Sequence, residues 1–120
     1  MLLRYRRGGK VDRRFGREGV RRLGRRRGAV SVIGLARGRG GRLVIGAQSG
    51  YAGWAFLGLT REGRPDPRFG ERVAERVGRY DGASLLDFAV HGRRIVGVGT
   101  DEIDERLDYA SYFVVGAFKG

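Results

Sequence analysis

Short apolar runs separated by glycine-rich turns are the dominant pattern along this chain. A first set of runs covers residues 29–36, 42–47, 54–60 and, more loosely, 64–77, and a second set covers 83–90, 94–99 and 109–118. These runs are rich in Val, Ile, Leu and aromatic residues, as hairpin strands require. No stretch has convincing helical periodicity, because the best candidate, 71–79, is short and contains two valines and a glycine. The pattern therefore predicts an all-β chain.

Two sequence motifs occur twice along the chain. The segment Gly9-Lys10-Val11-Asp12-Arg13-Arg14-Phe15-Gly16 recurs with the same spacing as Gly63-Arg64-Pro65-Asp66-Pro67-Arg68-Phe69-Gly70. Downstream, 42–47 corresponds to 94–99, and the apolar run 54–59 is echoed by 112–117. Self-similarity of this kind indicates a repeat architecture. We expect a single repeat region over 1–120, with units at 3–56 and 57–114 and residues 115–120 opening a third.

Each unit is expected to form four strands, and tandem four-stranded units are typical of propeller blades. The fold class predicted is therefore a partial β-propeller of two blades with the start of a third. A closed propeller needs roughly four to eight blades, so that no long strand edge is left open. We expect the partners of this segment to be neighbouring blades of a longer protein or further copies of the chain.

The motifs resemble those of the bacterial delta-sixty repeat family. One family motif is matched at Gly9, Asp12, Phe15 and Gly16 and again at Gly63, Asp66, Phe69 and Gly70; the other is matched at 41–45 and 93–96. Where the family has Asp before a turn glycine, this chain has Gly8, Glu62 and Gly40. The resemblance implies a propeller-type fold in a secreted or cell-surface protein. No signal peptide is expected, because Arg4 follows the first apolar residues at once.

The recurring motif has a structural interpretation that needs no ligand. In each copy the Asp is expected to accept hydrogen bonds from nearby backbone N–H groups and to close an Asx turn. The Phe supplies an apolar anchor between sheets, and the final Gly permits a positive φ. The alternative is a turn that presents the Asp carboxylates to a cation.

Positive charge is concentrated in the first half of the chain. The net charge is +12, and every basic residue except Lys10 and Lys119 is arginine. A tract containing Arg21, Arg22, Arg25, Arg26 and Arg27 could bind nucleic acid or another polyanion through its phosphates. The alternative is a solvated surface, because the matching stretch 71–81 mixes basic and acidic residues.

Catalytic and metal-binding patterns are weak in this sequence. The chain has no cysteine, and its one histidine, His91, lies in a predicted hairpin turn. Asp87 lies four residues away on a strand and is expected to share the face of Leu85 and Ala89. The acidic stretch 101–105 is expected in a loop, but it lacks the spacing of a calcium site. We therefore expect neither an enzyme nor a cofactor.

The prediction for function is a non-catalytic repeat segment with a structural or interaction-mediating role, and an arginine-rich polyanion-binding module is the alternative. The uncharged run 43–60 reaches the lower length limit of a membrane-spanning helix. Its polar, glycine-studded centre favours two strands joined by a loop. Membrane insertion is therefore not expected.

Overall fold

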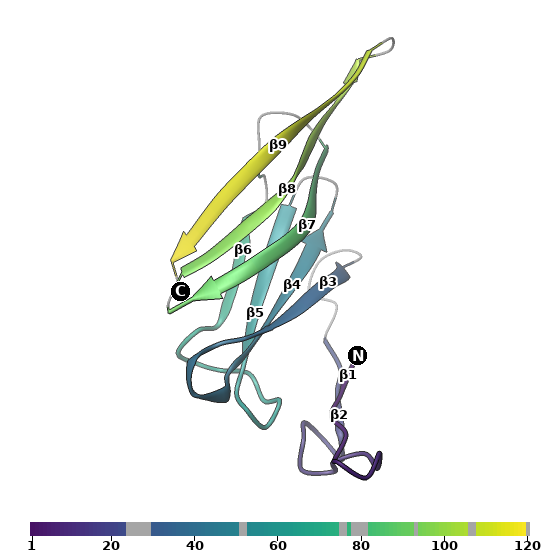
Figure 1. Ribbon diagram of the computed structural model, residues 1–120, viewed down its shortest axis with the longest axis vertical. Helices are drawn as coiled ribbons and strands as arrows, with labels where there is room; N and C mark the ends of the chain where they lie inside the picture. The colour runs from purple at the N-terminus through teal and green to yellow at the C-terminus, as the bar shows by residue number, and fades with distance from the viewer. Residues whose placement is uncertain are drawn as a thin grey trace.

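The strand-forming runs of the sequence fold into antiparallel sheets along an elongated molecule of 53 × 26 × 26 Å (Figure 1). The structure, a computed structural model, describes residues 1–23, 30–50, 53–74, 77, 82–92, 94–105 and 108–119, and it describes side chains only as far as Asp101. Within these ranges the regular elements are strands, apart from a single 3-10 turn, η1 (Arg39–Gly41). The all-β prediction is confirmed.

The first large sheet is a four-stranded antiparallel meander. Its strands are β3 (Val30–Arg37), β4 (Leu43–Ser49), β5 (Gly53–Leu59) and β6 (Glu71–Ala74), which pair in chain order. The fourth strand expected over 64–77 is present but shorter, because a tight turn occupies 64–70 and β6 begins at Glu71. Residues 75 and 76 lie outside the described residues. Pro65 and Pro67 lie in that turn, and neither has an N–H group to donate to a ladder.

The second large sheet contains three strands within the described residues. They are β7 (Gly82–His91), β8 (Arg94–Glu105) and β9 (Asp108–Lys119), again in chain order and antiparallel. The expected loop at 101–105 was wrong, because β8 continues through this acidic stretch. β8 pairs with β9 without a break, from the pair Arg94 and Lys119 to the pair Glu105 and Asp108. The hydrogen-bonded pairing therefore continues beyond the apolar residues of β8 into its acidic residues.

The first strand of each large sheet carries a β-bulge. Pairing skips Ile33 in β3 and Leu86 in β7. At a bulge, two residues of one strand lie opposite one residue of the neighbouring strand. The side chains after the bulge therefore point to the opposite face of the sheet from the one that simple alternation predicts. Leu85 is consequently buried while Asp87 is exposed. The expectation that Asp87 shares the face of Leu85 was wrong for this reason.

A small N-terminal lobe, residues 1–23, lies at one end of the molecule (Figure 1). Its two short strands, β1 (Leu2–Leu3) and β2 (Val20–Arg21), pair with each other. At the opposite end the β8–β9 hairpin extends away from the rest of the fold. The lobe and the hairpin therefore mark the two ends of the long axis.

The core lies between the two large sheets. It contains the buried side chains of Val44, Trp54, Phe56, Phe69, Val77, Ala83, Leu85 and Ile95. Two large rings lie against glycines of the facing sheet: Phe88 contacts Gly46, and a Cβ at Gly97 would come within 2.7 Å of the Trp54 ring. The faces therefore approach closely where one sheet offers an aromatic ring and the other offers no side chain.

An amide side chain joins the two sheets through hydrogen bonds. Gln48 of β4 donates from Nε2 to the carbonyl oxygen of Ala83 at 2.7 Å. Its Oε1 accepts from the backbone N–H of Leu85 at 2.8 Å. Both bonds reach β7, so Gln48 fixes the position of β7 relative to the first sheet.

Candidate functional site

The second copy of the recurring motif forms a tight turn between β5 and β6. Asp66 is 5% exposed, and its Oδ1 accepts a hydrogen bond from the backbone N–H of Arg68 at 2.9 Å. Its backbone carbonyl accepts from the N–H groups of Phe69 at 3.2 Å and Gly70 at 2.7 Å. Gly63 and Gly70 have φ values of 77° and 69°, which glycine adopts without strain.

The first copy forms the corresponding turn between β1 and β2. Asp12 Oδ1 accepts from the backbone N–H of Arg14 at 3.1 Å, and the Asp12 carbonyl accepts from the N–H of Phe15 at 3.0 Å. Gly9 and Gly16 also have positive φ, at 76° and 62°. The structure therefore places all eight motif residues in two turns, each closing a hairpin. The two turns share the bond to the Asp side chain and the bond from the Phe N–H, whereas the last glycine of each motif donates to a different carbonyl.

Arginine side chains face both motif carboxylates. Arg4 Nη2 lies 2.9 Å from Asp12 Oδ2, and Arg42 forms an ion pair with the buried Asp66. The hydrogen bond from the N–H of Arg14, followed by the Arg4 side chain, holds the pKa of Asp12 below its usual range. A cation at either turn would compete with a guanidinium group, so the arrangement favours the structural interpretation.

The first motif turn is docked onto the second. Phe15 is 2% exposed, and a Cβ at Gly63 would come within 2.6 Å of its ring. The N–H of Gly16 donates to the carbonyl of Glu62 at 2.6 Å, and Arg4 Nη1 donates to the carbonyl of Arg61 at 2.6 Å. The guanidinium of Arg4 also lies 5.0 Å above the Phe15 ring.

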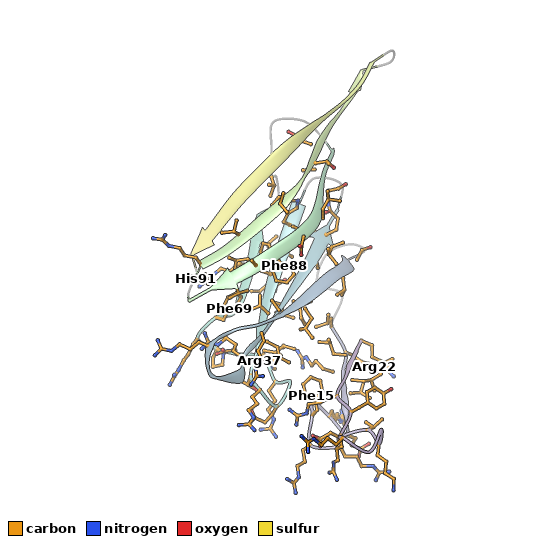
Figure 2. The ribbon with its side chains drawn as sticks, in the orientation of Figure 1. Phe15, Arg22, Arg37, Phe69, Phe88 and His91 are labelled. Carbon is orange, nitrogen blue, oxygen red and sulfur yellow. The ribbon has the colours of Figure 1, made fainter. Side chains whose placement is uncertain are left out.

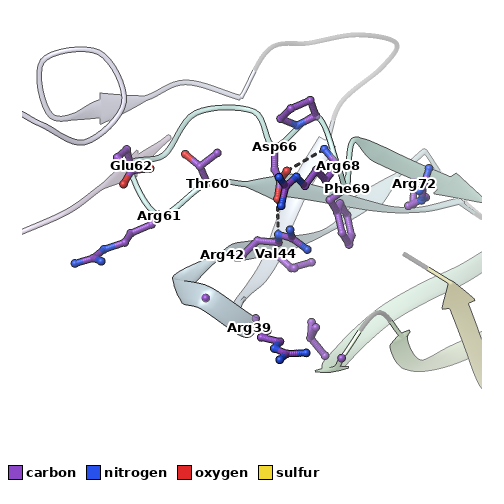
Figure 3. A pocket seen from close by; sticks show the side chains of 15 residues that line it. Arg39, Arg42, Val44, Thr60, Arg61, Glu62, Asp66, Arg68, Phe69 and Arg72 are labelled. Atoms are coloured by element: carbon purple, nitrogen blue, oxygen red, sulfur yellow. Dashed lines mark hydrogen bonds and ion pairs between the residues drawn. The ribbon is translucent and has the colours of Figure 1, made fainter.

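A cleft of about 830 Å³ opens beside the second motif turn, as Figure 3 shows. It is formed by the β3–β4 turn, the β5–β6 turn and the end of β7. Val44, Phe69 and Val90 contribute apolar side chains to its lining. Five arginines also line it: Arg39, Arg42, Arg61, Arg68 and Arg72. We call this hollow the arginine cleft.

Contacts within the fold position several of these arginines. Arg42 turns inward to Asp66 and ties the β3–β4 turn to the motif turn (Figure 3). The side chain of Arg61 lies close to Gly41, where a Cβ would be 3.4 Å from its Cδ. Arg72 lies with its guanidinium 6.0 Å from the centre of the Phe69 ring. Three of the five arginine side chains therefore have contacts within the fold, whereas Arg39 and Arg68 are exposed.

The arginine cleft was missed by sequence reasoning. Its arginines are scattered over residues 39–72, and only the fold brings them together. The available signal was the abundance of arginine along the chain. Arginine content alone does not show which arginine side chains lie close together in the folded chain.

The arginine tract singled out from the sequence is only partly described. Arg21 lies half-buried in β2, and its Nε has no hydrogen-bond partner among the described residues. Arg22 is exposed, and Figure 2 shows it on the N-terminal lobe. Arg25, Arg26 and Arg27 lie outside the described residues.

The candidate catalytic groups of the sequence lie in the second sheet. Asp87 and His91 are both exposed on β7, and Asp87 Oδ1 accepts from the N–H of Phe88 at 2.8 Å. Asp101 is buried in β8 at 2% exposure. In the part of the chain that has been described, no three acidic or histidine side chains are grouped so as to hold a metal ion.

Comparisons with family models, with curated proteins and with solved structures find no match to this chain. Among the described residues there is no helix of the length and apolar character needed to cross a membrane.

Proposed function

We propose that this chain is a non-catalytic β-propeller-type repeat segment with a structural or interaction-mediating role. In this proposal its sheets stack against further sheets, which belong either to a longer protein or to additional copies of the chain. The observation that carries the proposal is a group of exposed apolar side chains, Leu86, Val96 and Val98, on the outer side of β7 and β8, next to the exposed Asp87. The closed ring and the relationship to the delta-sixty repeat family are parts of the same proposal.

The outer face of β8 exposes valines where a solvated sheet would carry polar residues. Ile95 and Gly97 face the core. Val96 and Val98 alternate with them along β8 and are 42% and 36% exposed on the outer side. On β7, Leu86 at the bulge is 56% exposed. An antiparallel sheet with one face in water normally alternates apolar and polar residues. Apolar side chains on the outer face as well as the inner one favour a second sheet packed on the outer side.

The packing inside the molecule supports the same proposal. The two large sheets already stack face to face, with Trp54 of one sheet against Gly97 of the other. Both begin with a bulged strand, and in both the strands pair antiparallel in chain order. A unit that stacks once in this way has the geometry to stack again on its open face.

Sedimentation velocity over a range of protein concentrations tests the proposal. We expect the isolated chain to associate as concentration rises, because the open face is apolar. Replacing both valines, Val96→Lys with Val98→Lys, should shift the population to monomer while the β-sheet circular dichroism is retained. The matched control is Val11→Lys, which charges a valine of similar exposure (37%) in the N-terminal lobe and should leave association unchanged.

Two results would contradict the proposal. One is a wild-type chain that stays monomeric at high concentration and unfolds cooperatively by itself. The other is association that the Val11 variant weakens as much as the β8 double variant does, since that would indicate a non-specific charge effect.

Polyanion binding is a second candidate, favoured by the charge of the N-terminal lobe. The lobe carries nine basic residues, namely Arg4, Arg6, Arg7, Lys10, Arg13, Arg14, Arg17, Arg21 and Arg22, against Asp12 and Glu18. Figure 2 shows side chains spreading from this end of the molecule. An exposed basic surface of this kind suits the phosphate backbone of a nucleic acid.

A salt titration with a single-stranded oligonucleotide tests the second candidate. We expect the logarithm of the binding constant to fall steeply with the logarithm of salt concentration. Changing Arg21, Arg22, Arg25, Arg26 and Arg27 to Gln should abolish binding and leave the fold intact. Absence of binding at micromolar protein and low salt would contradict it.

A further inference from the structure

We propose that the arginine cleft binds a small anion that carries at least two phosphate or carboxylate groups. The site is separate from the arginine tract and from the apolar outer face, so it does not depend on either candidate function.

The rim of the cleft carries more positive charge than its surroundings neutralise. Arg42 is paired with Asp66, but within the described residues no carboxylate lies in ion-pair range of the other four rim arginines, Arg39, Arg61, Arg68 and Arg72. Glu62 is the remaining acidic residue of the lining, and it is exposed. Like charges around one hollow repel each other, and a bound anion relieves that repulsion.

The ion pair between Arg42 and Asp66 supplies the frame. Asp66 is held by the backbone N–H of Arg68 on one oxygen and by Arg42 on the other. This pair joins two turns that are distant in the sequence and keeps their outward-facing arginines on opposite sides of one opening (Figure 3). A preformed arrangement of guanidinium groups loses less entropy when it binds an oxyanion bidentately.

The shape of the cleft favours a compact ligand over a polymer. Its volume of about 830 Å³ falls within the range of small-molecule sites. Its lining combines apolar side chains from Val44, Phe69 and Val90 with the arginine rim. Polymers such as nucleic acids bind along extended basic surfaces, which the N-terminal lobe resembles more closely. Two or more anionic groups are needed to reach arginines on different turns.

Isothermal titration of the whole chain, with tripolyphosphate in one arm and citrate in the other at constant ionic strength, tests the proposal. We expect saturable binding of at least one of them. Binding of tripolyphosphate alone assigns the site to phosphates, binding of citrate alone assigns it to carboxylates, and binding of both shows that it accepts either oxyanion.

The variant that tests the site is Arg39→Gln with Arg68→Gln. Both side chains are exposed, and the Arg68 contact to Asp66 comes from its backbone N–H, so the frame is retained. We expect affinity for the bound anion to fall about tenfold or more. The unliganded variant should melt at or slightly above the wild-type temperature, because two repelling charges are removed, and the anion should raise its melting temperature less than that of the wild type.

The chain contains a matched control in its other motif turn. Arg13→Gln with Arg14→Gln removes the same charge, and Arg14 has the same place after Asp12 as Arg68 has after Asp66. The control should bind the anion within about twofold of the wild type. The proposal is overturned if neither anion binds, or if the control loses as much affinity as the cleft variant.

Discussion

At the residue scale, the motif turn occurs twice, once around Asp12 and once around Asp66, with different neighbours around each. The side chains of Asp12 and Asp66 each accept a hydrogen bond from the backbone N–H two residues further on, yet these side chains are 16% and 7% exposed. Arg4 reaches Asp12 from its own hairpin, whereas Arg42 reaches Asp66 from a different turn. The local role of the two residues is therefore shared, and only Asp66 also joins separate parts of the fold.

Replacement of Asp66 should be strongly destabilising. Asp66→Ala removes the turn hydrogen bond and leaves the Arg42 guanidinium without its carboxylate. We expect a loss of about 3 kcal/mol in the free energy of unfolding, at the lower end for a broken buried ion pair because Arg42 is 30% exposed. Urea denaturation measures this. The control Glu62→Ala removes an exposed carboxylate and should change stability by less than about 0.5 kcal/mol.

Asp12 should make stability depend on acid pH. Its pKa in the folded chain lies below the usual value of 3.8, so its ionised form stabilises the fold. That contribution is fully present above the unfolded pKa and is lost as pH falls through the lowered folded pKa. We therefore expect the stability difference between wild type and Asp12→Asn to shrink between about pH 5 and pH 2. A difference that stays constant over this window would contradict the assignment.

At the element scale, each hairpin closed by a motif turn has one aromatic anchor. Phe69 lies against Gly58 within its own hairpin. Phe15 instead packs against Gly63 of the other motif turn, between the N-terminal lobe and the first large sheet. The same residue type therefore stabilises a hairpin in one copy and joins two hairpins in the other.

Loss of the Phe15 anchor should release the N-terminal lobe. Phe15→Ala leaves a cavity beside Gly63, which costs about 3 kcal/mol or more for a buried phenylalanine. We expect trypsin to cleave at the arginines of the lobe faster than in the wild type, because the docked state is less populated. Tyr5→Ala, at a side chain that is 60% exposed, should leave the cleavage rate unchanged. Equal rates for the two variants would contradict the anchoring role.

At the scale of the whole molecule, the two large sheets depend on positions without a side chain. Trp54 faces Gly97, Phe88 contacts Gly46, and Gln48 adds two hydrogen bonds between the sheets. The separation of the sheets is set where a ring from one sheet meets bare backbone on the other. A methyl group at such a position would have to displace a large aromatic ring.

Gly97→Ala should therefore weaken the packing of one sheet on the other. The added Cβ would lie 2.7 Å from the Trp54 ring and 3.2 Å from Leu85. We expect a loss of about 1–3 kcal/mol and a shift in Trp54 fluorescence as the ring moves. Gly8→Ala is the control, because a Cβ there meets nothing within 4 Å. An unchanged melting temperature for Gly97→Ala would show that the sheets adjust freely.

Much of the strand pattern could be predicted from the sequence because its causes are local. The expected runs 42–47, 54–60 and 83–90 overlap β4, β5 and β7. Alternating apolar residues and turn glycines act over a few positions, so their effect can be read from neighbours. There are two exceptions. The acidic half of β8 is extended by pairing with β9, and residues 64–70 form a turn where a strand was expected.

The amino-acid sequence by itself determined the all-β class, the positions of most strands and the two motif turns. Tertiary structure alone decided which face Asp87 takes, which arginine reaches Asp66, and that arginines from three segments surround one cleft. The physical reason is distance along the chain. Backbone conformation follows from adjacent residues, whereas a bulge, an ion pair between turns and a cleft depend on residues that meet only after the sheets have packed.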